Sequence, residues 1–159
     1  MDVKINDNSK QVCSAIEQAI TAALHEAGGE FLSQVQRNTR VDTSDTKASF
    51  GYEVIGDTVY VGSNSENAIW EEFGTGTHAE NGGESGYWVF VKGSGGKSRS
   101  NGKRYTLEKA KQIMAILRSK GLDAYYTNGK KGTHALRKAM EGKAPVAKNI
   151  VERKLRSVQ

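Results

Sequence analysis

A β-hairpin at residues 48–63, ASFGYEVIGDTVYVGS, constrains the fold of this chain more than any other stretch of its sequence. Gly56, followed by Asp57, suits a two-residue turn that requires positive φ. If Ile55 pairs with Thr58, a single register accounts for both strands, because it brings the apolar side chains to one face. That face is predicted to hold Phe50, Tyr52, Val54, Val59 and Val61, and the opposite face Glu53 and Tyr60.

A long helix is predicted ahead of the hairpin, from a cap near Asn8 or Ser9 to about Asn38. Apolar residues recur in it at steps of three and four, as is typical of an amphipathic helix. Each glycine of the pair Gly28-Gly29 weakens a helix by about 1 kcal/mol relative to alanine, so we expect a kink or break there. The apolar stripe consists of Val12, Ile16, Ala19, Ala23, Leu24, Ala27, Phe31 and Val35.

A short helix is predicted directly after the hairpin, at residues 66–73 with the sequence ENAIWEEF. Its apolar side chains, Ile69, Trp70 and Phe73, are expected to point inward and to wedge the helix against the sheet. The helix ends at Gly74-Thr75-Gly76, where glycine allows the chain to reverse tightly.

The second half of the chain alternates strands and helices. In order, we expect a strand at 87–91 covered on both faces, a flexible basic loop at 93–104, a helix from Thr106 to about Ser119, a strand at 122–127 and helical structure from about residue 135 onward. Gly142 and Pro145 predict a kink or a restart in the last helical segment. The predicted fold class is α+β, a single domain (1–159) whose small, mainly antiparallel sheet of about four strands is packed by a long N-terminal helix, an inserted helix and C-terminal helices.

Charge is distributed unevenly along the chain. Residues 1–91 hold 5 Lys/Arg against 14 Asp/Glu, whereas residues 92–159 hold 18 against 4, which together give the net charge of +5. Either the basic half contacts nucleic acid, or the acidic half of one copy meets the basic half of the next. No apolar run approaches the ~20 residues that cross a bilayer, and the start, MDVKIND, lacks the features of a secretory signal. We therefore expect a protein that is made in a cytoplasm and does not contact a membrane.

No set of residues predicts a catalytic, metal or cofactor site, so we expect a protein that is not an enzyme and carries no cofactor. Glu71 and Glu72 are neighbours on one helix, point about 100° apart and cannot converge as an acid–base pair. The stretch GSGGKS lacks the spacing of a phosphate-binding loop. Cys13, the only cysteine, is expected to be a buried structural thiol. No two histidines have the i, i+4 spacing that would bind a metal on one helix face; they are His25, His78 and His134.

Nucleic-acid binding is the alternative function. Many basic residues of the second half are interleaved with Tyr105, Tyr125 and Tyr126, and such a surface can bind phosphates and stack on bases. Because no finger, helix-turn-helix or RNP-type signature is present, the alternative is a monomeric, sequence-independent module. Its basic residues would be Lys97, Arg99, Lys103, Arg104, Lys130, Lys131, Arg137, Lys138, Lys148, Arg153, Lys154 and Arg156.

Three stretches, taken in order, resemble the tail-completion or head–tail joining proteins of tailed phages, whose fold is shared with tail terminators. They are residues 42–64, residues 66–83 and residues 125–155. The middle stretch is the most specific, because members carry a similar "EFGT" segment just after such a hairpin. Residues 93–123 look like an insertion. The matching residues are Trp70, Glu72, Phe73, Gly74, Thr75 and Gly76, with Ala135, Leu136, Arg137 and Ala139 in the looser third stretch.

The resemblance implies a structural virion-assembly protein, one subunit of a ring at the head–tail neck. Its partners would be copies of itself, the head connector and tail proteins, with passing contact to DNA, and it would be assembled in the bacterial host cytoplasm. Glu71 and Glu72 would then be left for solvent or for a neighbour's lysines. Acidic groups of residues 64–84 are expected to meet basic groups of the C-terminal helices, including Arg137 and Lys138, across the subunit contact.

Overall fold

The computed structural model describes residues 7–40, 44–93 and 103–158, and it confirms the α+β class. The chain divides into two compact units. Unit 1 comprises Met1–Ala68 and His134–Gln159, and unit 2 comprises Ile69–Thr133. The expected strands are present, but they form two separate two-stranded sheets, one in each unit, rather than one sheet of four.

The predicted hairpin lies in unit 1 and has the predicted register. Strands β1 (Phe50–Ile55) and β2 (Thr58–Ser63) are antiparallel, and Ile55 pairs with Thr58. Gly56 has the positive φ of 61° that the turn requires. The apolar face packs on helix α1, because Phe50 and Val61 join a core cluster with Val35.

Helix α1 (Ser9–Asn38) begins after Asn8, as predicted, and passes through Gly28-Gly29 without a break. The predicted break is therefore wrong, and the role of Gly28 is to let the hairpin approach the helix closely. A Cβ at this position would lie 2.5 Å from Cδ2 of Tyr52, so only a residue without a side chain fits under that ring. Tyr52 also packs edge-on against His25, with ring centroids 6.1 Å apart.

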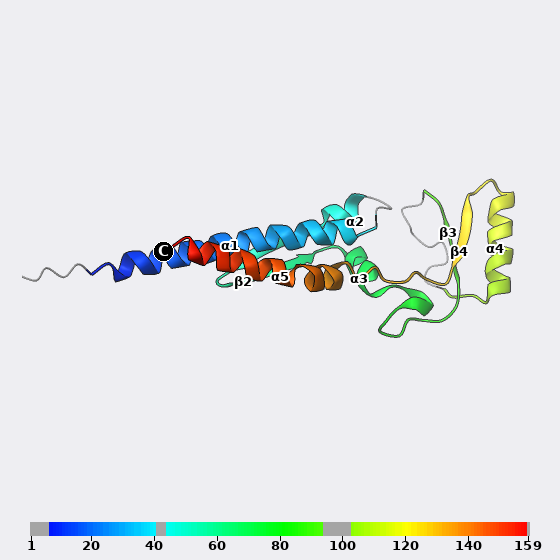
Figure 1. Ribbon diagram of the computed structural model, residues 1–159. Coiled ribbons are helices and arrows are strands. Elements are labelled where there is room, and N and C mark those ends of the chain that lie inside the picture. Colours follow the sequence, from blue (N-terminus) through cyan, green and yellow to red (C-terminus); the bar gives the residue numbers. More distant parts are fainter. Residues whose placement is uncertain (1–6, 41–43, 94–102, 159) are drawn as a thin grey trace, which may run out of the picture. The chain divides into compact units, whose positions relative to one another are not determined.

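Helix α5 (Ala135–Arg156) runs beside α1 in the opposite direction (Figure 1). Ala135 and Ala139 pack near Val35, and Ile150 packs near Ala23 and Ala27. Ion pairs line the same contact, between Lys143 and Glu30 at 2.7 Å and between Glu26 and both Arg153 and Lys154. The predicted restart at Gly142 and Pro145 is wrong: the helix is continuous, and contacts with α1 on both sides of the proline hold it.

The first turns of α1 extend beyond the contact with α5. Arg153 and Lys154, close to the end of α5, already reach Glu26, so α5 leaves the preceding turns of α1 uncovered. Val12 is 51% exposed. Cys13 is exposed as well, which corrects the expectation of a buried thiol. The apolar stripe was correctly located, but its N-terminal third does not contribute to the core.

Unit 2 contains a sheet covered on one face by a helix. Strands β3 (Trp88–Val91) and β4 (Ala124–Thr127) are antiparallel, and helix α4 (Leu107–Ser119) packs on one face through Ala110. Thr106 caps α4 as predicted, accepting a hydrogen bond from the N–H of Lys109. Most of the basic loop expected at 93–104 lies outside the described residues.

Three short elements complete the described chain. Helix α2 (Ser44–Ala48), which the sequence did not predict, precedes β1. Helix α3 (Glu66–Phe73) follows the hairpin as predicted, and a short 3-10 helix covers Gly76–His78. Every predicted helix and strand outside residues 94–102 is thus present, with ends within a few residues of those expected.

Candidate functional site

The segment that follows α3 runs against the chain between β4 and α5, and both segments belong to unit 2. Three backbone hydrogen bonds join them. The N–H of Thr75 donates to the Lys130 carbonyl at 2.8 Å, and the N–H of Thr77 donates to the Asn128 carbonyl at 2.9 Å. In the opposite direction, the N–H of Thr133 donates to the Glu71 carbonyl at 2.6 Å. Side chains add to this pairing: Thr133 Oγ1 donates to the Glu71 carbonyl, and the N–H of Lys130 donates to Thr75 Oγ1. We call residues 71–77 with 128–133 the glycine ladder.

Glycines make this close approach sterically feasible. A Cβ on Gly74 would lie 2.8 Å from both the Gly132 nitrogen and the Lys130 oxygen. Gly76 and Gly129 have φ values of 60° and 122°, which other residues rarely adopt. The motif Gly74-Thr75-Gly76 is therefore needed for a backbone-to-backbone contact with a segment more than fifty residues further along the chain.

Glu71 and Glu72 are buried, each only 6% exposed, which corrects the expectation that both are free for solvent or for a neighbouring subunit. Glu71 Oε1 forms an ion pair with Lys130, whose own side chain is 46% exposed. Its other oxygen, Oε2, is buried without a hydrogen-bond partner among the described residues. The bond from Thr133 to the Glu71 carbonyl fixes this residue within the ladder. The Glu71 carboxylate is therefore part of the buried interior of unit 2.

Ile69 and Trp70 are 59% and 47% exposed, so the prediction that they point inward is wrong. The reason lies in the ladder, which turns the acidic side of α3 into the interior and the apolar side outward. Phe73 is half-buried, and its carbonyl accepts the N–H of Glu80 at 3.0 Å. Trp70 is thus the large apolar residue of the motif whose side chain is exposed.

Arg137 and Lys138 lie in the first turn of α5, in unit 1, and both side chains are exposed. They are thus in a different unit from the glycine ladder. Their role in a subunit contact stays a prediction.

The sheet face opposite α4 carries a group of side chains that sequence reasoning missed. The Arg104 guanidinium lies 4.2 Å from the ring centre of Trp88, and that of Arg118 lies 5.2 Å from the ring of Tyr125. Phe90 and Tyr125 stack across the strands at 5.8 Å. The strand was expected to be covered on both faces, yet Trp88 and Phe90 are only half-buried and Tyr125 is 38% exposed. The alternation of aromatic and aliphatic side chains in WVFV was the signal that could have separated the faces.

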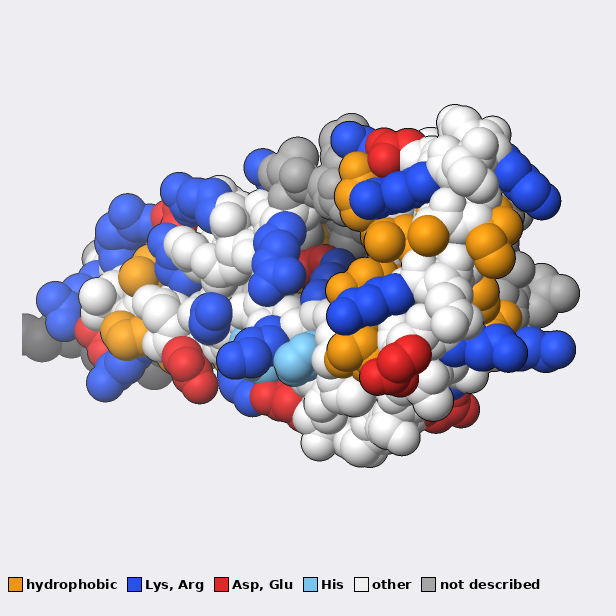
Figure 2. All heavy atoms as spheres, turned by 90° about the vertical axis from the view of Figure 1, so that its right-hand side faces the viewer, with side chains coloured by type: hydrophobic (Ala, Val, Ile, Leu, Met, Phe, Trp, Pro, Cys, Tyr) orange, Lys and Arg blue, Asp and Glu red, His pale blue; other side chains and the backbone are white. Residues whose placement is uncertain are grey.

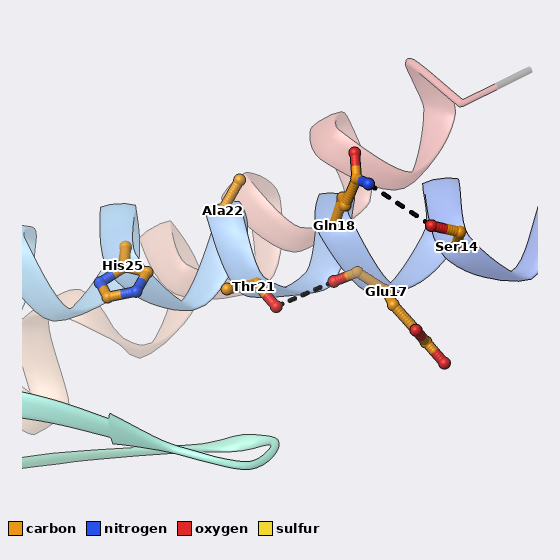
Figure 3. A pocket seen from close by; sticks show the side chains of 6 residues that line it. All are labelled: Ser14, Glu17, Gln18, Thr21, Ala22 and His25. Carbon is orange, nitrogen blue, oxygen red and sulfur yellow. Dashed lines mark hydrogen bonds between the residues drawn. The ribbon is translucent and has the colours of Figure 1, made fainter.

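A shallow depression on α1 has a volume of about 530 Å³ (Figure 3). A single helix supplies all six lining residues, which limits how many groups can converge on a ligand. Two of them form hydrogen bonds along the helix, from Thr21 Oγ1 to the Glu17 carbonyl and from Gln18 to Ser14. Among the residues that the structure describes, no three His, Cys, Asp or Glu side chains come together as metal ligands would.

The described helices include none that is both long and apolar enough to cross a membrane. The features in the described residues are thus those of an α+β protein with exposed apolar side chains and a backbone-locked motif, which suit contacts with other macromolecules. Residues 4–91 match the family model described as "Bacteriophage HK97-gp10, putative tail-component". This is more than half of the chain, and the chain belongs to the HK97 gp10-like family of phage tail components. No curated protein and no solved structure matches it.

Membership in this family makes the chain a phage tail component, whose place is the virion and whose contacts are with other phage structural proteins. The matched region covers α1, the hairpin, α3 and β3, and it ends where β3 ends. Helix α4 and strand β4 lie beyond it, as does the second half of the glycine ladder.

Proposed function

We propose that this chain is a structural subunit that assembles with copies of itself into a ring at the head–tail junction of a phage, and that it is not an enzyme. Its location would be the virion neck, after assembly in the host cytoplasm. Its further partners would be the head connector and tail proteins.

The observation that carries this proposal is that the buried apolar side chains are mostly small, whereas many large apolar side chains are exposed. Seven of the twelve buried apolar residues in the described chain are alanines, and the largest fully buried side chains are Val35 and Val89. Large apolar side chains lie outside instead, among them Trp70, Ile55 and Tyr60 at 47%, 57% and 56% exposure. Ile55 and Tyr60 share one face of the hairpin, and exposed apolar side chains that gather in this way typically mark a protein–protein contact.

A ring is the form of self-assembly that such a surface favours in a tail component. Heterologous contacts between different faces of neighbouring copies either close into a ring or continue as a filament. A ring leaves no unmatched contact around its circumference and matches the tubular symmetry of a neck through which DNA passes. The resemblance of residues 42–64 and 66–83 to head–tail joining proteins supports the same location.

Native mass spectrometry over a wide range of protein concentration tests the proposal. We expect a discrete oligomer whose subunit number does not grow with concentration, as closure requires. A chain that remains monomeric at every concentration, alone and mixed with its head and tail partners, would contradict self-assembly. Open-ended growth would contradict the ring.

Nucleic-acid binding is the second candidate function, because unit 2 carries the whole net charge. Its 65 residues hold 11 Lys/Arg against 6 Asp/Glu, which gives +5, whereas unit 1 holds 12 of each. Figure 2 shows basic side chains among apolar ones on the face that it views. DNA retention that falls steeply with salt, and that Lys111→Ala with Lys120→Ala weakens, would support this candidate. Lys148→Ala in unit 1 is the control. If the wild-type chain retains no DNA at low salt, the nucleic-acid-binding candidate is eliminated.

A further inference from the structure

The two sheets share one property: a helix of the same unit packs on one face of each sheet, and no described helix of that unit packs on the other face. In unit 1 the hairpin packs on α1, and its opposite face exposes Glu53, Ile55 and Tyr60. Glu53 and Tyr60 are direct cross-strand partners, so these side chains form one patch. Together with Asp57 in the turn, we call them the acidic hairpin face.

In unit 2 the sheet packs on α4, and its opposite face carries the aromatic–arginine group. Trp88, Phe90 and Tyr125 lie outside the core cluster that α4 covers. Arg104 and Arg118 flank them, each stacked on a ring. We call these five residues the arginine face. A two-stranded sheet that is open on one side is marginal by itself, so both faces would gain from being covered.

The charges on the two open faces are opposite. Glu53 and Asp57 form no ion pair within the described structure, in contrast to Glu26, Glu30 and Glu71, which each bind a basic side chain. The arginine face has a positive charge and belongs to the unit that carries the net charge of +5. Arg104 has one acidic partner, Glu84, at 3.2 Å, and that carboxylate is 76% exposed. Arg118 donates from Nε to the Ala124 carbonyl at 2.9 Å, which leaves its terminal nitrogens for other acceptors.

We propose that the acidic hairpin face of one copy packs on the arginine face of the next copy. This inference rests on the proposed function, since it names the two surfaces that join neighbouring subunits. Ile55 and Tyr60 would cover the rings of Trp88 and Tyr125, and Glu53 would reach Arg104 or Arg118. Sheets pack face to face about 10 Å apart, so both sets of side chains would interdigitate.

A second copy of the chain fits this contact because every copy carries both faces, and the two faces are complementary rather than identical. A pairing between unlike faces is heterologous, and repetition of it around an axis uses both faces of every subunit. Aromatic rings and arginines are the residue types enriched at the centre of protein–protein interfaces. Three residues of the arginine face, Arg104, Arg118 and Tyr125, lie beyond the part of the chain that matches the family model.

Charge reversal tests the contact. Glu53→Arg and Arg118→Glu should each weaken self-association at least tenfold, because each places like charges opposite each other. A double variant with both changes restores opposite charges at every contact, so it should assemble like the wild type. Matched controls reverse exposed charges elsewhere, with Glu17→Arg on α1 and Lys111→Glu on α4, and should leave assembly unchanged.

Restoration by the second change separates a lost contact from a lost fold, because a misfolded single variant would not recover. Arg118→Glu also removes the hydrogen bond from Arg118 to the Ala124 carbonyl. Thermal unfolding of each variant, followed by circular dichroism, therefore checks that the fold is retained. If the wild type forms rings and both single variants form them equally well, the contact lies elsewhere and the proposed function stands. If the singles fail and the double variant also fails, the two faces are not partners.

Two further outcomes overturn the inference in other ways. If the wild-type chain never self-associates, the proposed ring fails together with its interface. If Arg118→Glu abolishes DNA retention while assembly is intact, the arginine face is a nucleic-acid surface.

Discussion

Gly76 and Gly129 face each other across the glycine ladder so closely that a Cβ on either residue would lie 3.0 Å from the Cα of the other. Each Cβ would also collide with a backbone carbonyl oxygen, that of Asn128 for Gly76 and that of Thr75 for Gly129. Backbone atoms cannot turn aside as a side chain can. The motif at residues 74–76 thus depends on a second glycine pair at 129 and 132.

The first prediction concerns the stability of this ladder. Gly76→Ala should reduce the free energy of unfolding by more than about 2 kcal/mol, because alanine is strained at φ 60° and collides with backbone. Urea denaturation measures the change. Gly62→Ala is the control, since a Cβ there meets nothing within 4 Å. Equal effects of the two changes would show that the ladder does not require the close approach.

The second prediction uses two adjacent glycines of α1. Gly29→Ala should stabilise the chain by about 1 kcal/mol, because alanine is the better helix former and nothing lies within 4 Å of its Cβ. Gly28→Ala should instead destabilise it by about 1–2 kcal/mol, since the new methyl group displaces the ring of Tyr52. Thermal unfolding of both variants is compared with the wild type. Two stabilising substitutions would mean that the hairpin does not press on α1 at this point.

Local signals predicted the hairpin and the helix ends well. The register of β1 and β2 followed from the Gly56-Asp57 turn and from alternation over twelve residues, both of which act between near neighbours. Thr106 and Gly121 likewise mark the ends of α4, Thr106 through its side-chain cap and Gly121 through its positive φ of 76°. Such features depend little on the rest of the chain.

The candidate site was predicted less well, because it depends on contacts between distant segments. The helical pattern of α3 suggested Trp70 inside and Glu71 outside, and the structure has the reverse. Residues 71–77 pair with 128–133, and this pairing decides which side of α3 is covered. The glycines at 74, 76, 129 and 132 were visible in the sequence, but nothing local indicated that they meet.

The third prediction concerns the buried carboxylate of Glu71. Lys130→Ala should reduce the free energy of unfolding by about 1–3 kcal/mol, because it leaves a 6%-exposed carboxylate without its cation. Adding Glu71→Gln should recover part of this loss, since the neutral amide does not require the cation. Denaturant unfolding of the two single variants and the double variant forms a complete cycle. Additive effects would indicate that the ion pair contributes no coupling energy.

The fourth prediction concerns the pH dependence of the contact between α1 and α5. A hydrogen bond from Arg153 holds the pKa of Glu26 below its ordinary value of 4.5, and Lys143 does the same for Glu30. A folded-state pKa below the unfolded one means that the stabilisation is present above pH 4.5 and is lost as the pH falls below it. The melting temperature of the wild type should therefore decrease in this acidic range, and added salt should reduce the effect because both carboxylates face solvent.

Replacing Glu26 and Glu30 together by glutamine tests the assignment. The double variant should melt at a lower temperature than the wild type at neutral pH, and the two melting temperatures should converge as the pH falls below 4.5. Glu17→Gln, which removes an exposed carboxylate of α1 that forms no ion pair in the described structure, should leave the pH profile unchanged. If the double variant loses stability below pH 4.5 as steeply as the wild type, other carboxylates control the acid sensitivity, and the ion pairs between α1 and α5 do not.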